Sequence, residues 1–100
     1  MSKLSILIPA YNMREYINQC LASIRRTVRI PYEVIIIDDG SQEDECVSII
    51  EGEDDVRVLS LKQHYGISHA LNMGIDAAEG AVILFLHADI MLAPNTVDDL

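Results

Sequence analysis

One stretch of the chain decides its fold: Val34-Ile35-Ile36-Ile37-Asp38-Asp39-Gly40-Ser41. An unbroken run of β-branched apolar residues is typical of a strand that is buried on both faces of a parallel sheet. The two aspartates then mark the C-terminal end of that strand. Gly40 permits a tight turn, and Ser41 with Asp44 fits the Ser-x-x-Asp start of a helix. Ligands of open α/β sheets bind outside the carboxyl ends of the strands, so Asp38 and Asp39 are candidate site residues.

Strand-like and helix-like segments alternate along the rest of the chain. We expect strands over residues 4–9, 34–37, 56–61 and 81–86, and helices over residues 13–28, 42–50, 67–78 and from 93 onward. Pro9 is expected to end the first strand, because proline cannot donate to a ladder. The order βαβαβαβα with short connections predicts an α/β fold with a parallel sheet. We expect residues 1–100 to form a single domain, truncated soon after its last helix begins.

The charge of the chain limits its partners. The formal net charge is −9, which argues against a nucleic-acid partner or an anionic membrane surface, because both require a basic patch. Nine of the sixteen acidic residues lie between Asp38 and Asp55, and no lysine or arginine follows Lys62. A phosphate bound in the second half would therefore need a metal cation.

Hydropathy predicts the location of the chain. The short apolar run before Pro9 lacks the length of a signal peptide, and no apolar run approaches the ~18 residues that span a bilayer. We therefore expect a cytoplasmic location, at the membrane face if a longer protein is anchored there. We also expect the apolar edge near residues 81–86 to invite self-association.

Polar side chains follow each expected strand. They are Tyr11 and Asn12, Asp38 and Asp39, His64 and Tyr65, and His87 and Asp89. Since the carboxyl ends of parallel strands share one edge of a sheet, these residues are expected to converge on one site. The sequence has no Gly-x-Gly-x-x-Gly after its first strand and no Gly-x-x-x-x-Gly-Lys-Ser/Thr, which argues against dinucleotide oxidoreductases and P-loop NTPases.

Several motifs in the right order carry a family resemblance over nearly the whole chain. They are Ile8-Pro9-Ala10-Tyr11-Asn12, the Asp-Asp-Gly-Ser of residues 38–41, Asn72-Met73-Gly74, Ala78-Glu79-Gly80 and Phe85-Leu86-His87-Ala88-Asp89. With these motifs the chain resembles the N-terminal, nucleotide-binding half of family 2 glycosyltransferases, which have the Rossmann-like GT-A fold. The resemblance implies a UDP- or GDP-sugar donor, a divalent metal (Mn²⁺ or Mg²⁺), and transfer of the sugar to an acceptor hydroxyl with inversion.

The resemblance also implies roles for individual residues. Pro9, Ala10 and Tyr11 would line the nucleoside pocket, with Tyr11 near the base. Asp39 would accept a hydrogen bond from an N–H of the base, and Asp38 would help to shape that loop. The other expected nucleotide-sugar-binding residues are Asn12, Gly66, Asn72, His87 and Ala88.

The expected metal ligand is Asp89, which stands at the last position of the family's Asp-x-Asp motif. Here His87 replaces the first aspartate. Imidazole suits Mn²⁺ better than Mg²⁺, and His87 has three open roles: metal ligation, a bond to phosphate, or satisfying backbone groups. A second departure is Leu71, where many members carry arginine. The family's general base lies in a later segment, so no catalytic residue is assigned here and the isolated chain is expected to be inactive.

Plainer alternatives remain for several of these residues. Asp38 and Asp39 would then be loop acids that cap the next helix, and Asn72 would pin a loop. For His64 and His69, whose spacing matches no paired-ligand arrangement, surface or packing roles are favoured. Two other functions stay open. A receiver-like signalling module would need an acid after the third strand, and residues 62–66 contain none; a non-catalytic nucleotide-binding module needs no base.

Overall fold

The computed structural model describes residues 4–11, 14–40 and 56–87. In chain order its elements are β1 (Leu4–Ala10), α1 (Arg14–Thr27), β2 (Tyr32–Asp38), β3 (Val56–Ser60), α3 (Ile67–Ala77) and β4 (Val82–Phe85). The helices expected over 42–50 and from 93 onward lie outside the described residues.

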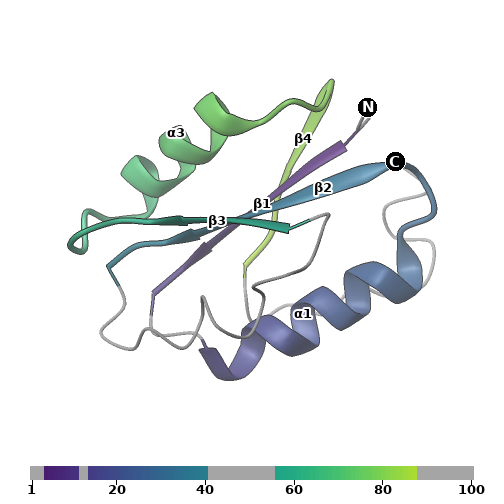
Figure 1. The fold of residues 1–100 in the computed structure, drawn as a ribbon, viewed down its shortest axis with the longest axis horizontal. Helices are drawn as coiled ribbons and strands as arrows, with labels where there is room; N and C mark the ends of the chain where they lie inside the picture. The colour runs from purple at the N-terminus through teal and green to yellow at the C-terminus, as the bar shows by residue number, and fades with distance from the viewer. Residues whose placement is uncertain (1–3, 12–13, 41–55, 88–100) are drawn as a thin grey trace.

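The strands form one parallel sheet in the order β3-β2-β1-β4. This arrangement confirms the predicted α/β fold with a parallel sheet. Helix α1 connects β1 to β2, and α3 takes the chain from β3 at one edge to β4 at the other. The two helices lie on opposite faces of the sheet (Figure 1). The sheet is therefore the middle of three layers.

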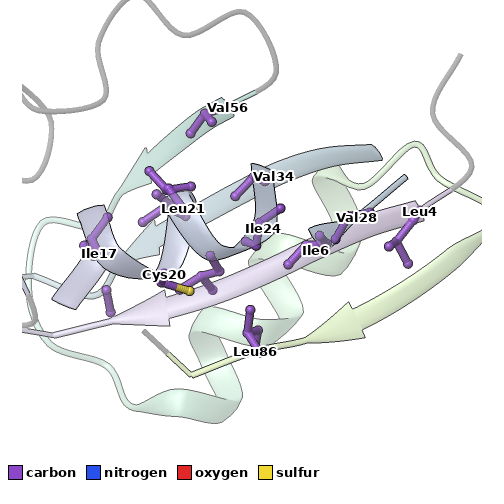
Figure 2. Close-up of a cluster of buried hydrophobic side chains, with 13 residues drawn as sticks. Leu4, Ile6, Ile17, Cys20, Leu21, Ile24, Val28, Val34, Val56 and Leu86 are labelled. Atoms are coloured by element: carbon purple, nitrogen blue, oxygen red, sulfur yellow. The ribbon is translucent and has the colours of Figure 1, made fainter. Parts of the chain in front are cut away.

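The alternation of side chains along β1 and β2 assigns each residue to one helix. Even-numbered residues of these strands pack with α1 in one buried cluster, which Figure 2 shows. Odd-numbered apolar residues, Leu7, Ile35 and Ile37, pack with Ala70 of α3 in a second cluster. Both Ile35 and Ile36 are fully buried, so β2 is covered on both faces as its sequence predicts.

Pro9 does not end the first strand, because β1 continues to Ala10, which pairs with Asp38. The reason lies in the direction of the hydrogen bonds. The carbonyl of Leu7 accepts from Leu86, so the odd-numbered residues of β1 direct their bonds toward β4, and the ladder with β4 ends at Leu7. The missing N–H of Pro9 therefore costs no sheet hydrogen bond.

Strand β4 forms one edge of the sheet and leaves apolar side chains exposed. Val82 is 52% exposed and Phe85 51% exposed. Within the described residues the edge is therefore apolar and accessible, as the sequence predicts. Among the same residues, no helix combines the length and the apolar character that crossing a membrane requires.

A buried carboxylate at the amino end of β2 holds the C-terminal end of α3. Glu33 lies on the α3 face, where its Oε2 accepts hydrogen bonds from Ser5 Oγ at 2.6 Å and from the Glu79 backbone N–H at 2.7 Å. Its Oε1 accepts from Arg57 at 2.9 Å. The side chain of Glu33 is only 11% exposed, so these three donors replace nearly all of its water.

The donors of Glu33 are themselves tied to the end of α3. Arg57 also donates to the carbonyl of Ala77 at 2.7 Å, and Ser5 Oγ accepts from the Gly80 N–H at 2.8 Å. We call these residues the Glu33 cluster: Ser5, Glu33, Arg57, Ala77, Glu79 and Gly80. The cluster joins three strands to the segment that follows α3.

The environment of Glu33 sets its acidity. Burial acts to raise the pKa of the carboxyl, but hydrogen bonds from Ser5, Glu79 and Arg57, with the charge of Arg57, hold that pKa below its usual value. A carboxyl whose pKa is lower in the folded state stabilises the fold above its unfolded pKa. That contribution is lost as the pH falls through the folded pKa.

We predict that Glu33→Gln lowers the free energy of unfolding by about 1.5–3 kcal/mol, the usual worth of hydrogen bonds to a charged group. The variant should also lose the part of the acid sensitivity that begins near pH ~4.3, the ordinary pKa of glutamate. Urea unfolding at pH 7 and at a series of pH values from about 4.3 downward measures both effects. The matched control is Glu79→Gln, because Glu79 contributes only its backbone N–H to the cluster. Equal stability of the two variants at pH 7 would contradict the role given to Glu33.

Candidate functional site

The candidate site is an open pocket of about 160 Å³ at the carboxyl edge of the sheet. It is lined by residues from the ends of β1, β2 and β4 and from the segment before and at the start of α3: Pro9, Ala10, Tyr11, Asp39, His64, Ile67 and His87. The chain runs outward from β1 through β2 to β3 and then crosses back to β4 on the other side of β1, so the direction of the connections reverses at β1. Such a reversal opens a crevice at the strand ends, where α/β proteins bind ligands.

The pocket brings together many of the residues that the sequence singles out. Pro9, Ala10, Tyr11, Asp39 and His87 line it. Gly66 joins it indirectly, through a hydrogen bond to Asp39.

Two of the other expected site residues are described and do not line the pocket. Asn72 is exposed on α3 and is absent from the described lining, while Asp38 is buried and, by the alternation of β2, belongs to the α1 face. Asn12, Ala88 and the expected metal ligand Asp89 lie outside the described residues.

Asp39 fixes the start of α3 to the end of β2. The alternation along β2 places it on the α3 face, in line with Ile35 and Ile37. Its Oδ1 accepts the N–H of Tyr65 at 2.9 Å, and its Oδ2 accepts the N–H of Gly66 at 2.9 Å. The side chain of Asp39 is only 4% exposed. Its carboxylate is thus largely occupied by the protein itself, and its contact with a base stays a prediction.

Gly40 allows the turn after β2 to lie against the segment before α3. Its φ is +76°, and a Cβ placed there would lie 2.3 Å from the Gln63 carbonyl carbon and 2.5 Å from the His64 nitrogen. Both neighbours are backbone atoms and cannot move aside locally. The lack of a Cβ at Gly40 therefore lets residues 63 and 64 lie close to the turn, where the Asp39 carboxylate reaches the N–H groups of Tyr65 and Gly66.

His64 covers Asp39 and stacks on Tyr11. Its Nδ1 lies 3.0 Å from Asp39 Oδ2 and 3.3 Å from the Asp39 carbonyl oxygen. Both oxygens only accept, so Nδ1 carries the proton and donates. The imidazole also lies against the Tyr11 ring, with centroids 3.9 Å apart and planes tilted by 31°. The ring is half exposed, yet it is part of the pocket wall, as its position after the third expected strand predicts and unlike the surface or packing role that was favoured for it.

A signal for His64 was present in the sequence. The residue follows a strand on the same edge as Asp39, but spacing between histidines was the wrong test, because its partners are an aspartate and a tyrosine from other strand ends.

A second, mostly apolar pocket of about 110 Å³ adjoins the first and shares Pro9, Ile67 and His87 with it. Leu71 lines this second pocket, together with Phe85 and Leu86. Leu71, at the position where arginine was expected from the family resemblance, therefore lies beside the candidate site.

We predict that Gly40→Ala destabilises the chain more than Gly66→Ala does. Both glycines have positive φ, +76° and +103°, so both alanines carry a backbone strain of about 1–3 kcal/mol. A Cβ at Gly66 has no other atom within 4 Å, whereas a Cβ at Gly40 collides with backbone. Urea unfolding of the two variants gives the comparison, and in Gly40→Ala the amide chemical shifts of Tyr65 and Gly66 should move away from their wild-type values. Equal stability would show that the contact is not close.

Known proteins with similar sequence share this chain's pattern over nearly its full length. Glycosyltransferase GlyG of Streptococcus pneumoniae is 32% identical over 100 residues, which cover 97% of this chain and 33% of that protein. The chain spans about a third or less of the length of the curated relatives it matches.

Solved structures share the fold. S. aureus TarS 1-349 in complex with UDP-GlcNAc is 27% identical with a TM-score of 0.84, and the match covers 99% of this chain and 30% of that one. Mannosyltransferase PcManGT from Pyrobaculum calidifontis, in complex with GDP-Man and Mn²⁺, is 25% identical with a TM-score of 0.84, covering 95% of this chain and 30% of that one. The family model described as Glycosyl transferase family 2 matches residues 5–100. The chain belongs to this glycosyltransferase family.

Proposed function

We propose that this chain binds the nucleotide-diphosphate-sugar donor of a metal-dependent, inverting glycosyltransferase that transfers a hexose to an acceptor hydroxyl. One observation carries the proposal: residues from three strand ends, each expected from the sequence to hold the donor, line one pocket. The relatives support it, because TarS was solved with UDP-GlcNAc and PcManGT with GDP-Man. We also propose that these 100 residues alone hold the donor without transferring the sugar, because the family's base lies in a later segment.

The nucleoside is proposed to lie against Tyr11, Pro9 and Ala10. Tyr11 is 39% exposed, so an aromatic surface is accessible at the end of β1. Pro9 and Ala10 bring backbone and small apolar groups beside it, which suits the flat face of a base. Asp39 offers the acceptor for an N–H of that base, which uracil and guanine both possess.

We propose that a divalent cation is shared between the protein and the diphosphate, because the described residues contain no group of three or more His, Cys, Asp or Glu side chains that would hold one alone. Mg²⁺ and Mn²⁺ sites of this kind use one or two protein ligands together with phosphate oxygens. His87 lines the pocket, and Asp89 follows it by two positions. The described lining contains no lysine or arginine, so protein side chains there offer no fixed positive charge to the diphosphate. We propose that Asp89, with His87, holds the cation.

The proposed division of work follows from charge. When bound, the cation stabilises the negative charge that grows on the nucleoside diphosphate as it leaves. The protein's own part is to orient the nucleoside through Tyr11 and Asp39 and to supply the proposed cation ligands Asp89 and His87. The receiver-like alternative has no support in this arrangement, because no acid lines the pocket from the segment after β3.

We predict that UDP or GDP binds the purified chain in the presence of Mn²⁺ and that Asp89→Ala weakens this binding about tenfold or more. Isothermal titration with each nucleotide, with and without Mn²⁺, measures the effect. The control is Asp76→Ala, an exposed acid on α3 that does not line the pocket. Unchanged affinity in Asp89→Ala would remove Asp89 from the metal site. Absence of binding by both nucleotides would count against a donor site in this chain.

We further propose that copies of the chain associate through the exposed edge at β4. Val82→Lys, which places a charge on that edge, should shift a concentration-dependent light-scattering mass toward the monomer. A monomeric wild-type chain at high concentration would end this proposal. A cytoplasmic location stays a prediction from the sequence.

A further inference from the structure

We propose that the His64 imidazole is an internal stand-in for the donor's base, and that the nucleotide binds only when this ring leaves the pocket. The inference rests on the proposed donor site, because it uses the roles given there to Tyr11 and Asp39. What it adds is a competing state, built from the chain's own residues, in which the base-binding position is already filled.

The first support is the set of hydrogen bonds to Asp39. Oδ1 accepts from Tyr65, and Oδ2 accepts from Gly66 and faces His64 Nδ1 at 3.0 Å. With the carboxylate only 4% exposed, little of it is left for an incoming donor. The two backbone N–H groups cannot leave without displacing the start of α3. The imidazole is the one of these three partners that rotates away about side-chain bonds, so a base N–H reaches Asp39 by taking its place.

The second support is the stacking on Tyr11. The His64 and Tyr11 ring centroids are 3.9 Å apart, which is shorter than the usual range for aromatic pairs and leaves no room for a third ring between them. A base that stacks on this face of Tyr11 must therefore replace the imidazole. One ring thus fills both places assigned to the base: it makes a planar contact with Tyr11, and its Nδ1, which hydrogen-bonds to the Asp39 carbonyl oxygen, lies 3.0 Å from Asp39 Oδ2.

The local surroundings allow the ring to move. The His64 side chain is 50% exposed. It belongs to the segment between β3 and α3. The backbone of this segment packs against Gly40 and is bonded to Asp39 through the Gly66 N–H, while the imidazole itself lines the pocket. A half-exposed ring held by one hydrogen bond and one stacking contact is displaced at modest cost.

The consequence is a lower apparent affinity for nucleotide. If only the fraction of molecules with the ring displaced binds, the apparent dissociation constant is the intrinsic one divided by that fraction. Removing a single hydrogen bond of ordinary strength changes such a fraction by roughly 2- to 10-fold. His64→Ala should therefore bind UDP or GDP about 2- to 10-fold more tightly than the wild-type chain.

The test has two independent readouts. Isothermal titration of UDP and GDP with Mn²⁺ compares wild type, His64→Ala and the control His69→Ala. His69 stacks on Tyr65 with centroids 4.5 Å apart and does not line the pocket, so its removal should leave affinity unchanged. The second readout uses wild type only, with Mg²⁺ in place of paramagnetic Mn²⁺. Nuclear Overhauser contacts between the His64 and Tyr11 rings should be present in the free chain and vanish at saturating nucleotide.

The outcomes separate the two proposals. Tighter binding in His64→Ala, with loss of the ring contacts in wild type, supports the stand-in. Binding that is equal or weaker in His64→Ala, or ring contacts that persist in the complex, overturns the stand-in and leaves the donor site standing. Binding by His64→Ala alone supports both. If neither chain binds either nucleotide, the donor site and the stand-in fall together.

Discussion

The structure depends on two carboxylates of one strand that hold the two ends of one helix. Glu33, near the start of β2, fixes the segment after α3, and Asp39, just past its end, fixes the segment before it. Six residues of strand span about 20 Å, and the 11 residues of α3 span about 16 Å, so the two anchors match the helix in length. Between them, Gly74 lets the helix lie directly on Ile37 and Leu7. The start of this fixed helix, at Ile67, forms part of the pocket wall.

The order of elements could be predicted because β2 and its neighbours are so strongly apolar. Ile35 and Ile36 have no plausible place except inside a covered parallel sheet. The end of β1 was predicted one residue early, because the sequence does not show that Pro9 faces β4 at a point where the ladder with β4 has already ended. The Glu33 cluster was not foreseen, since Ser5, Arg57 and Gly80 are far apart in sequence. One clue existed: Glu33 shares the parity of two buried isoleucines, and a charge on a buried face needs a partner.

For the site, sequence reasoning found the strand ends but not the contacts between them. Parallel topology alone brings Tyr11, Asp39 and His87 to one edge, which is why the pocket contains them. What side chains do there depends on turns: Gly40 positions residues 63 and 64, and only then does His64 reach Asp39 and Tyr11. Family membership indicates the class of reaction. The geometry adds that the carboxylate of Asp39 already accepts hydrogen bonds from the backbone at the start of α3.

The strands on the two sides of the pocket differ in burial and in pairing. Tyr11 and Asp39 extend from β1 and β2, a central pair that is covered by a helix on each face. His87 extends from β4, a four-residue strand bonded to β1 alone among the described strands. Free energies of local opening follow such differences in burial. Amide exchange is therefore expected to be graded across a single pocket, slowest at the ends of β1 and β2 and fastest at the end of β4 beside His87. A local opening at β4 would thus leave the part of the pocket formed by β1 and β2 in place.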